Sequence, residues 1–209
     1  MCDVICVTNR KLCKEDFLGR IEKIAREHPK AIILREKDLL VTMQAKQREI
    51  TESSYEQLAK EVLQICKKYR VSCILHEFVD VDKKLNCDAV HLPFHSLLKL
   101  KEEDRKRFLI LGASCHSLDE AIQAEKMGCT YIIVGHIFET ECKKGLEPRG
   151  ISFLHEICNN VSIPVYAIGG IHEKNVRKVQ EAGAAGVCIM SGLMTCENPK
   201  EYFARIREQ

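Results

Sequence analysis

Eight short apolar segments, rich in β-branched residues, recur along the chain of 209 residues, and a stretch with helical periodicity follows each of them. The segments are nearly continuous in apolar residues, as strands of a parallel sheet covered on both faces are. This alternation restricts the chain to α/β folds with a parallel sheet. The expected strands are residues 3–8, 31–36, 72–77, 89–92, 108–114, 131–135, 164–170 and 186–192.

The spacing of the segments favours a closed barrel. Eight units in 209 residues leave about 26 residues for each, near the lower size limit of a (β/α)₈ barrel. An open doubly wound sheet usually has fewer strands and a glycine-rich turn after the first, whereas VTNRKLC contains no glycine. We therefore expect a single-domain (β/α)₈ TIM barrel over residues 1–209. About a dozen residues separate Leu75 from Ala89, so the third helix should be short or replaced by a turn.

Three sequence signals predict where helices begin. SSYE at 53–56 and SLDE at 117–120 have the pattern of a capping box. The pair Asn198–Pro199 places a capping residue before a proline at the first helical position. We expect helices to start at all three places.

Charge and hydropathy exclude several classes of partner. Lysine and arginine number 32, aspartate and glutamate 30, and the charges are interspersed, so no basic face is expected for nucleic acid or a membrane surface. The N-terminal MCDVICVTNRKLC lacks the features of a signal peptide, and no stretch approaches the ~18 apolar residues that span a bilayer. We expect a soluble, cytoplasmic protein.

Twelve cysteines are an unusual number for this length. They form no C-x-x-C pair and no cluster of the zinc-finger type. Several lie in apolar runs, such as Cys6 in VICV, Cys73 in SCIL and Cys188 in VCIM, where a reduced thiol behaves as a small hydrophobe. We expect core thiols in a reducing compartment, with a metal site or a redox role as alternatives.

The last two expected strands end in small residues that suit a phosphate site. In TIM barrels the loops after strands seven and eight often bind phosphate, and these ends read AIGGI and IMSG. Gly169 and Gly170 would let backbone N–H groups approach an anion, and Ser191 and Gly192 would face them, each pair before a helix N-terminus. The alternative is two tight turns that merely require glycine.

The sixth strand leads into a polar loop, GHIFETECKKGLEPRG at 135–150. His136 follows the strand end, where a side chain points into the barrel mouth, and histidine titrates near neutral pH, so we predict a catalytic acid–base role. The alternative is a side chain that only hydrogen-bonds loop backbone. Thr140, Lys143 and Arg149 are predicted to bind substrate, although lysines in such a run are often only solvated surface.

Other strand ends add polar candidates. Of these, we predict that Arg35, Lys37 and Ser114 bind substrate. A structural role is as good an interpretation as ligand binding for His91 and His116. The full set is Arg35, Glu36, Lys37, His76, Glu77, His91, Ser114 and His116. Their convergence at one barrel end is stronger evidence than any one of them.

Three motifs resemble a known superfamily: VGHIFETECKKGLEPRG, IPVYAIGGIHEKNV and GAAGVCIMSG. They are similar to the thiamine phosphate synthases and the thiazole tautomerase TenI, and the likeness extends in order over nearly the full chain. The resemblance implies a TIM barrel, a homodimer and a phosphorylated thiazole ligand. It also implies one of two reactions: coupling of a pyrimidine pyrophosphate to thiazole phosphate with magnesium, or aromatisation of a carboxythiazole phosphate.

Departures from the synthase pattern favour the second reaction. Synthases typically carry an Asn-Asp pair after strand three and a later Asp that together hold magnesium; by position these become His76–Glu77 and Ser96 here. One carboxylate is a poor cage for a hard cation. His136, Glu139 and Cys142 replace two prolines and a threonine of the synthase loop, giving the tautomerase version, in which the histidine transfers the proton.

We therefore predict a thiazole tautomerase of thiamine biosynthesis that uses no cofactor and no metal. The alternative is a thiamine-phosphate synthase with magnesium, because ILREK keeps Arg35 and Lys37, which in synthases grip the pyrophosphate. A regulatory, non-enzymatic role is disfavoured because nothing in the chain resembles a DNA-reading helix or a basic patch.

Overall fold

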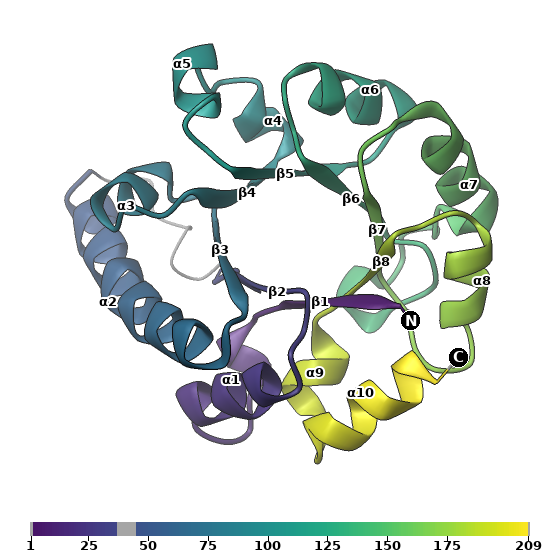
Figure 1. Ribbon diagram of the computed structural model, residues 1–209, viewed down its shortest axis with the longest axis horizontal. Helices are drawn as coiled ribbons and strands as arrows, with labels where there is room; N and C mark the ends of the chain where they lie inside the picture. Colours follow the sequence, from purple (N-terminus) through teal and green to yellow (C-terminus); the bar gives the residue numbers. More distant parts are fainter. Residues whose placement is uncertain (1, 37–44, 209) are drawn as a thin grey trace.

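The computed structural model describes residues 2–36 and 45–208. Eight parallel strands pair in chain order and close into a barrel, with β8 beside β1. The described helices surround the barrel (Figure 1). The strands are β1 Asp3–Val7, β2 Ala31–Leu34, β3 Ser72–His76, β4 Ala89–Pro93, β5 Ile110–Cys115, β6 Tyr131–Gly135, β7 Val165–Ile168 and β8 Gly186–Ile189.

Every expected strand is present within a few residues of its predicted bounds, which confirms the (β/α)₈ fold class. The third unit contains only the six-residue helix α3, Val79–Lys84, as its short spacing predicted. The remaining helical elements are η1 Arg10–Leu12, α1 Phe17–Arg26, α2 Ala45–Tyr69, α4 Phe94–Leu97, α5 Glu102–Arg105, α6 Leu118–Lys126, η3 Glu141–Lys143, α7 Gly150–Asn160, α8 Val176–Glu181, α9 Ser191–Thr195 and α10 Pro199–Arg207.

Two of the three predicted helix starts are confirmed. The Ser117 hydroxyl accepts a hydrogen bond from Glu120 N at 3.1 Å and caps α6. Asn198 caps α10, and Pro199 is its first residue. The start at 53–56 is wrong, because α2 already begins at Ala45 and passes through Ser53. The upstream AKQRE consists of good helix formers, which extend the helix past a serine that would otherwise cap it.

The core has two layers, as alternate strand residues point inward and outward. Inward side chains fill the barrel, among them Ile5, Ile33, Ile133 and Tyr131. A larger apolar layer lies between strands and helices. The cysteines carry free thiols and, apart from the exposed Cys142, are buried or half-buried, so the chain uses them mainly as small apolar side chains.

No helix in the part of the chain described is long and apolar enough to cross a membrane.

Candidate functional site

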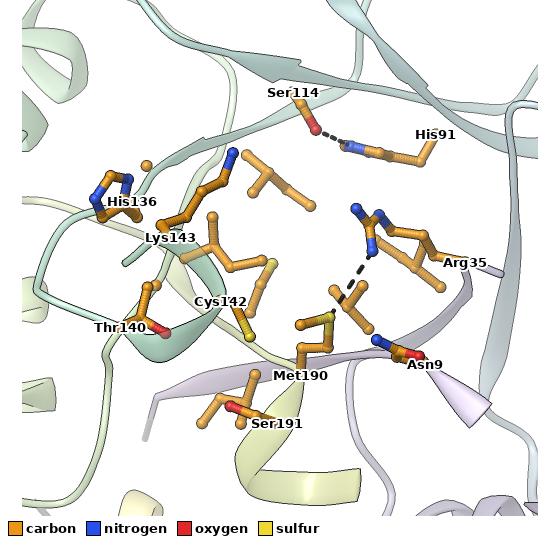
Figure 2. Close-up of a pocket in the computed structure, with 18 of the residues that line it drawn as sticks. Asn9, Arg35, His91, Ser114, His136, Thr140, Cys142, Lys143, Met190 and Ser191 are labelled. Carbon is orange, nitrogen blue, oxygen red and sulfur yellow. Dashed lines mark hydrogen bonds between the residues drawn. The ribbon is translucent and has the colours of Figure 1, made fainter. Parts of the chain in front are cut away.

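A cavity of about 840 Å³ opens at the carboxyl ends of the barrel strands. This is the end at which TIM barrels carry their sites, since the loops after all eight strands meet there. Figure 2 shows the side chains that converge on it from opposite walls. Its polar lining residues are Asn9, Arg35, His76, Glu77, His91, His95, Ser114, His116, His136, Thr140, Cys142, Lys143 and Ser191.

The structure brings most of the predicted site residues together. Those that line the cavity are Arg35, Ser114, His136, Thr140, Lys143, Gly169, Gly170, Ser191 and Gly192. Lys37 lies outside the described residues. Arg149 does not line the cavity: it is exposed, and its guanidinium carbon lies 5.2 Å from the centre of the Phe153 ring. Its predicted contact with substrate therefore has no support from the geometry.

Gly169 and Gly170 seat the loop after β6 against the end of β7. Their φ angles are +99° and +67°, a conformation that favours glycine. A Cβ on Gly169 would lie 2.3 Å from the Cβ of His136, and one on Gly170 would lie 2.3 Å from the carbonyl oxygen of Glu139. The turns therefore require glycine for packing, which is the alternative that the sequence left open, and the same small residues keep backbone exposed to the cavity.

Ser191 and Gly192 begin α9 directly after β8 and line the cavity beside the β7 turn. The first N–H groups of a helix have no partner within it, so they can donate to an anion. An anion at this corner would meet Gly170 from one side and Ser191 from the other. The arrangement suits a phosphate group.

His136 follows β6 through a cis peptide bond with Gly135. The ring is half-buried, and its Nε2 lies 3.2 Å from the carbonyl oxygen of Leu146 in the same loop. A carbonyl can only accept, so a neutral His136 carries its proton on Nε2 and has an unprotonated Nδ1. The loop thus favours one neutral tautomer of this ring.

The cavity carries more positive than negative charge. Arg35 and Lys143 approach it from opposite walls, and Figure 2 shows both side chains directed inward. Burial lowers the pKa of Arg35, yet a guanidinium stays charged at neutral pH. Glu77 is the one carboxylate among the described residues that line the cavity. This balance favours an anionic ligand.

His91 is almost fully buried on the cavity floor. Its Nε2 lies 2.8 Å from Ser114 Oγ, and its Nδ1 lies 3.0 Å from the hydroxyl of Tyr131. Burial, together with the charge of Arg35, lowers the pKa of His91 to about 3. The ring therefore stays neutral at physiological pH.

The donors at the ends of β3 and β4 do not match the magnesium site of synthases. Glu77 supplies a single carboxylate and accepts a hydrogen bond from Ser96 Oγ at 3.1 Å. The neighbouring side chain is an imidazole, with His76 Nδ1 3.8 Å from Glu77 Oε2, whereas magnesium prefers an octahedron of oxygens. Within residues 2–36 and 45–208 no group of three or more His, Cys, Asp or Glu could hold a metal.

Sequence reasoning assigned no role to four residues that line the cavity: Asn9, His95, Cys142 and Met190. Asn9 and Met190 follow β1 and β8 closely, so a rule that counts every strand end would have found them. His95, on the short α4, follows the end of β4 at Pro93 just as closely, so the same rule would have found it. Cys142 lies on η3, away from any strand end, and is placed by the conformation of the loop after β6.

A family model described as thiamine monophosphate synthase matches residues 4–193. A thiamine-phosphate synthase of Fusobacterium nucleatum is 33% identical over 208 residues, covering 98% of this chain and 95% of that protein. The thiamine-phosphate synthase of Clostridium acetobutylicum is 32% identical over 201 residues, covering 93% and 88%. The solved thiamine phosphate pyrophosphorylase of Pyrococcus furiosus superposes with a TM-score of 0.77 at 26% identity, covering 99% of this chain and 94% of that one.

Proposed function

Because this chain belongs to the thiamine monophosphate synthase family and is an enzyme of thiamine biosynthesis, we propose that its cavity binds a thiazole phosphate and moves a proton within it. The reaction is the aromatisation of a carboxythiazole phosphate tautomer. One proton leaves the ring carbon that bears the carboxylate, and one is added to the exocyclic carbon. Atoms and electrons balance without a redox partner.

The observation that carries the proposal is the position of His136. Its ring lies in the cavity wall, and the Leu146 carbonyl holds it in the tautomer that leaves Nδ1 free to accept a proton. The same base, once protonated, can return the proton to the exocyclic carbon. Gly170 and Ser191 are proposed to hold the phosphate on the adjoining side of the cavity. The remaining polar groups of the ligand are proposed to contact Arg35, Ser114, Thr140 and Lys143.

The second candidate is the synthase reaction, and two observations favour it. The relatives named above carry the synthase name, so the comparisons support this alternative better than the tautomerase. Arg35 also points into the cavity, where it could neutralise a pyrophosphate. Against it stands the single carboxylate of Glu77, which does not fit the magnesium that such a leaving group needs.

One experiment separates the two reactions. The purified protein is given either the carboxythiazole phosphate tautomer, or thiazole phosphate with the pyrimidine pyrophosphate, each with and without magnesium. We expect aromatic product from the first substrate at equal rates in both conditions, and only a trace of pyrophosphate from the second pair. Robust magnesium-dependent release of pyrophosphate would instead establish the synthase.

Substitution of His136 tests the proposed base. Positioned acid–base groups contribute about 10²–10⁴-fold to rate, so His136→Asn and His136→Ala should lose that much turnover with little change in ligand affinity. His172→Asn is the matched control, because this exposed histidine lies outside the cavity lining. If His136→Asn turns over within a few-fold of the parent, His136 is not the base and has only a structural role.

We propose in the same way that the protein acts in the cytoplasm as a homodimer of single-domain barrels, as the resemblance implies. Sedimentation velocity of the purified chain measures its oligomeric state, and a monomer at micromolar concentration would exclude the dimer.

A further inference from the structure

Three strands meet at one level inside the barrel, beneath the cavity. His91 on β4 is paired with Gly112 on β5, and Gly112 with Tyr131 on β6. A Cβ on Gly112 would lie 2.2 Å from Cζ of Tyr131, so only glycine lets the phenol cross β5 and reach the histidine. The ring centres of His91 and Tyr131 are 5.5 Å apart. The absence of a side chain at Gly112 thus leaves the space that the Tyr131 ring occupies.

We propose that Tyr131 holds His91 in the tautomer with its proton on Nε2, so that His91 donates to Ser114 and turns the Ser114 hydroxyl into a hydrogen-bond donor for the ligand. Tyr131 and His91 are positioning residues here, and Ser114 is the group that touches the ligand. The inference deepens the proposed function and rests on it for the identity of the ligand.

The tautomer follows from counting donors and acceptors. In the described part of the chain, the Tyr131 hydroxyl contacts a single hydrogen-bonding group, His91 Nδ1 at 3.0 Å. The phenol is buried, and burial raises its pKa, so it keeps its proton. If Nδ1 carried a hydrogen, the phenol hydrogen would be buried without an acceptor, which native structures avoid. Tyr131 therefore donates to Nδ1, and the proton of the neutral ring lies on Nε2.

The direction of the next bond is then fixed. Nε2–H donates to Ser114 Oγ over 2.8 Å. Ser114 cannot donate back to a nitrogen that already holds a hydrogen, and the described residues offer its hydroxyl no other partner. Its hydrogen is left for the cavity that the half-buried side chain lines.

The charged groups around His91 keep it from becoming an imidazolium. Arg35 from the end of β2 repels a positive ring, and the His76 ring from β3 stacks on it at 5.9 Å. Among the described residues, no hydrogen bond or ion pair joins the His91 ring to a carboxylate, and Glu77 is bonded to Ser96 instead. His91 therefore cannot activate Ser114 as a base does in a nucleophilic dyad, because Nε2, the nitrogen that faces Ser114, already carries a hydrogen.

A donor hydroxyl on this wall selects an acceptor on the ligand. Ser114 comes from β5, across the cavity from the phosphate corner at β7 and β8. In a carboxythiazole phosphate, the acceptor distant from the phosphate is the carboxylate. We assign Ser114 to that carboxylate, whose hydrogen bond would be charge-assisted.

Nitrogen NMR of protein labelled with ¹⁵N-histidine tests the tautomer directly, without any ligand. His91 should show a protonated Nε2 and an unprotonated Nδ1 between pH 6 and 8. In Tyr131→Phe, a fraction of the His91 rings should carry the proton on Nδ1 instead, because Ser114 can then donate to Nε2. Tyr166→Phe is the matched control: its ring packs edge-on to Tyr131 at 5.9 Å and leaves His91 untouched. The His91 signals are identified by their loss in His91→Gln or, should that variant not fold, by their response to Ser114→Ala.

Protonated Nδ1 in the parent, or an unchanged His91 spectrum in Tyr131→Phe, would overturn the assignment.

Binding measurements by calorimetry test the consequence. Ser114→Ala should weaken binding of the carboxythiazole phosphate about 10-fold and leave binding of thiazole phosphate without the carboxylate nearly unchanged. Tyr131→Phe should weaken the first ligand less, and the double variant should bind it no worse than Ser114→Ala alone. If the affinity losses of Ser114→Ala and Tyr131→Phe multiply in the double variant, Tyr131 does not act through Ser114 and the proposal is wrong. If the parent binds neither ligand, the proposed function fails, while the NMR result still decides the tautomer.

Discussion

We predict that Asp82 makes the stability of this barrel fall as pH rises. The side chain lies on α3, behind the β3 end of the site, and is fully buried. Neither carboxylate oxygen has a hydrogen-bond partner among the described residues, and the guanidinium of Arg107 approaches only to 3.6 Å, from Nη2 to Oδ1. Burial raises the pKa of Asp82 to about 7, from 3.8, and outweighs the opposing effect of Arg107. The folded state thus binds this proton more tightly than the unfolded chain.

The sign and the size follow from proton linkage. Because the folded state holds more protons between pH 4 and 7, the free energy of unfolding decreases across that range and levels off above it. A tenfold difference in proton affinity corresponds to about 1.4 kcal/mol, so Asp82 alone should lower stability by about 2 kcal/mol between pH 5 and pH 7. Asp82→Asn keeps the shape and removes the titration. Its stability relative to the parent should therefore rise by about 2 kcal/mol over this interval.

Urea unfolding followed by circular dichroism measures the difference at each pH, which suits a chain without tryptophan. Asp80→Asn is the matched control, since Asp80 is an exposed residue of the same helix. It removes a carboxylate from the same helix without touching the buried one. If the stability curves of Asp82→Asn and the parent run parallel between pH 5 and 7, Asp82 titrates normally and the reasoning from burial is wrong.

Three further outcomes are expected. Lys143→Ala should weaken binding of thiazole phosphate about 10-fold by calorimetry, whereas Lys144→Ala should not, because Lys144 is 82% exposed and lies outside the cavity lining. Gly170→Ala should lower the free energy of urea unfolding by about 1–3 kcal/mol, because its Cβ would meet the Glu139 carbonyl at 2.3 Å. Tyr55→Phe should cost about 1–3 kcal/mol in the same assay, because the phenol bonds two strand backbone groups at 2.7 and 3.1 Å.

The barrel could be predicted because its signal is repeated eight times. Each strand is an independent apolar segment, and an error of two residues at one end, as at 164–170 against β7, leaves the topology unchanged. Helix starts rest on a single motif each and are more fragile. The wrong start at Ser53 shows that a capping motif predicts a start only where the preceding residues do not themselves continue the helix.

The lining of the candidate site could be predicted as far as strand ends determine it. Ser114, His136 and the turns after β7 and β8 face one cavity because parallel strands bring their carboxyl ends to one rim. The direction of Arg149 could not be predicted, because it lies at the far end of a long loop, where sequence separation says nothing about direction. The Tyr131–His91 contact was invisible as well, because it depends on strand register across Gly112 rather than on any local motif.

The choice between the two reactions of this family comes down to one corner of the barrel. The turns after β7 and β8, which we propose bind phosphate, suit either reaction, since both ligands carry a phosphate. At the ends of β3 and β4, Glu77 adopts φ +71°, which asparagine and aspartate tolerate better than glutamate. Ser96 bonds the Glu77 carboxylate where a second carboxylate would be needed to share a divalent cation. The corner is therefore arranged around a single acid, and this is the observation that favours the proposed proton transfer by His136 over the synthase reaction.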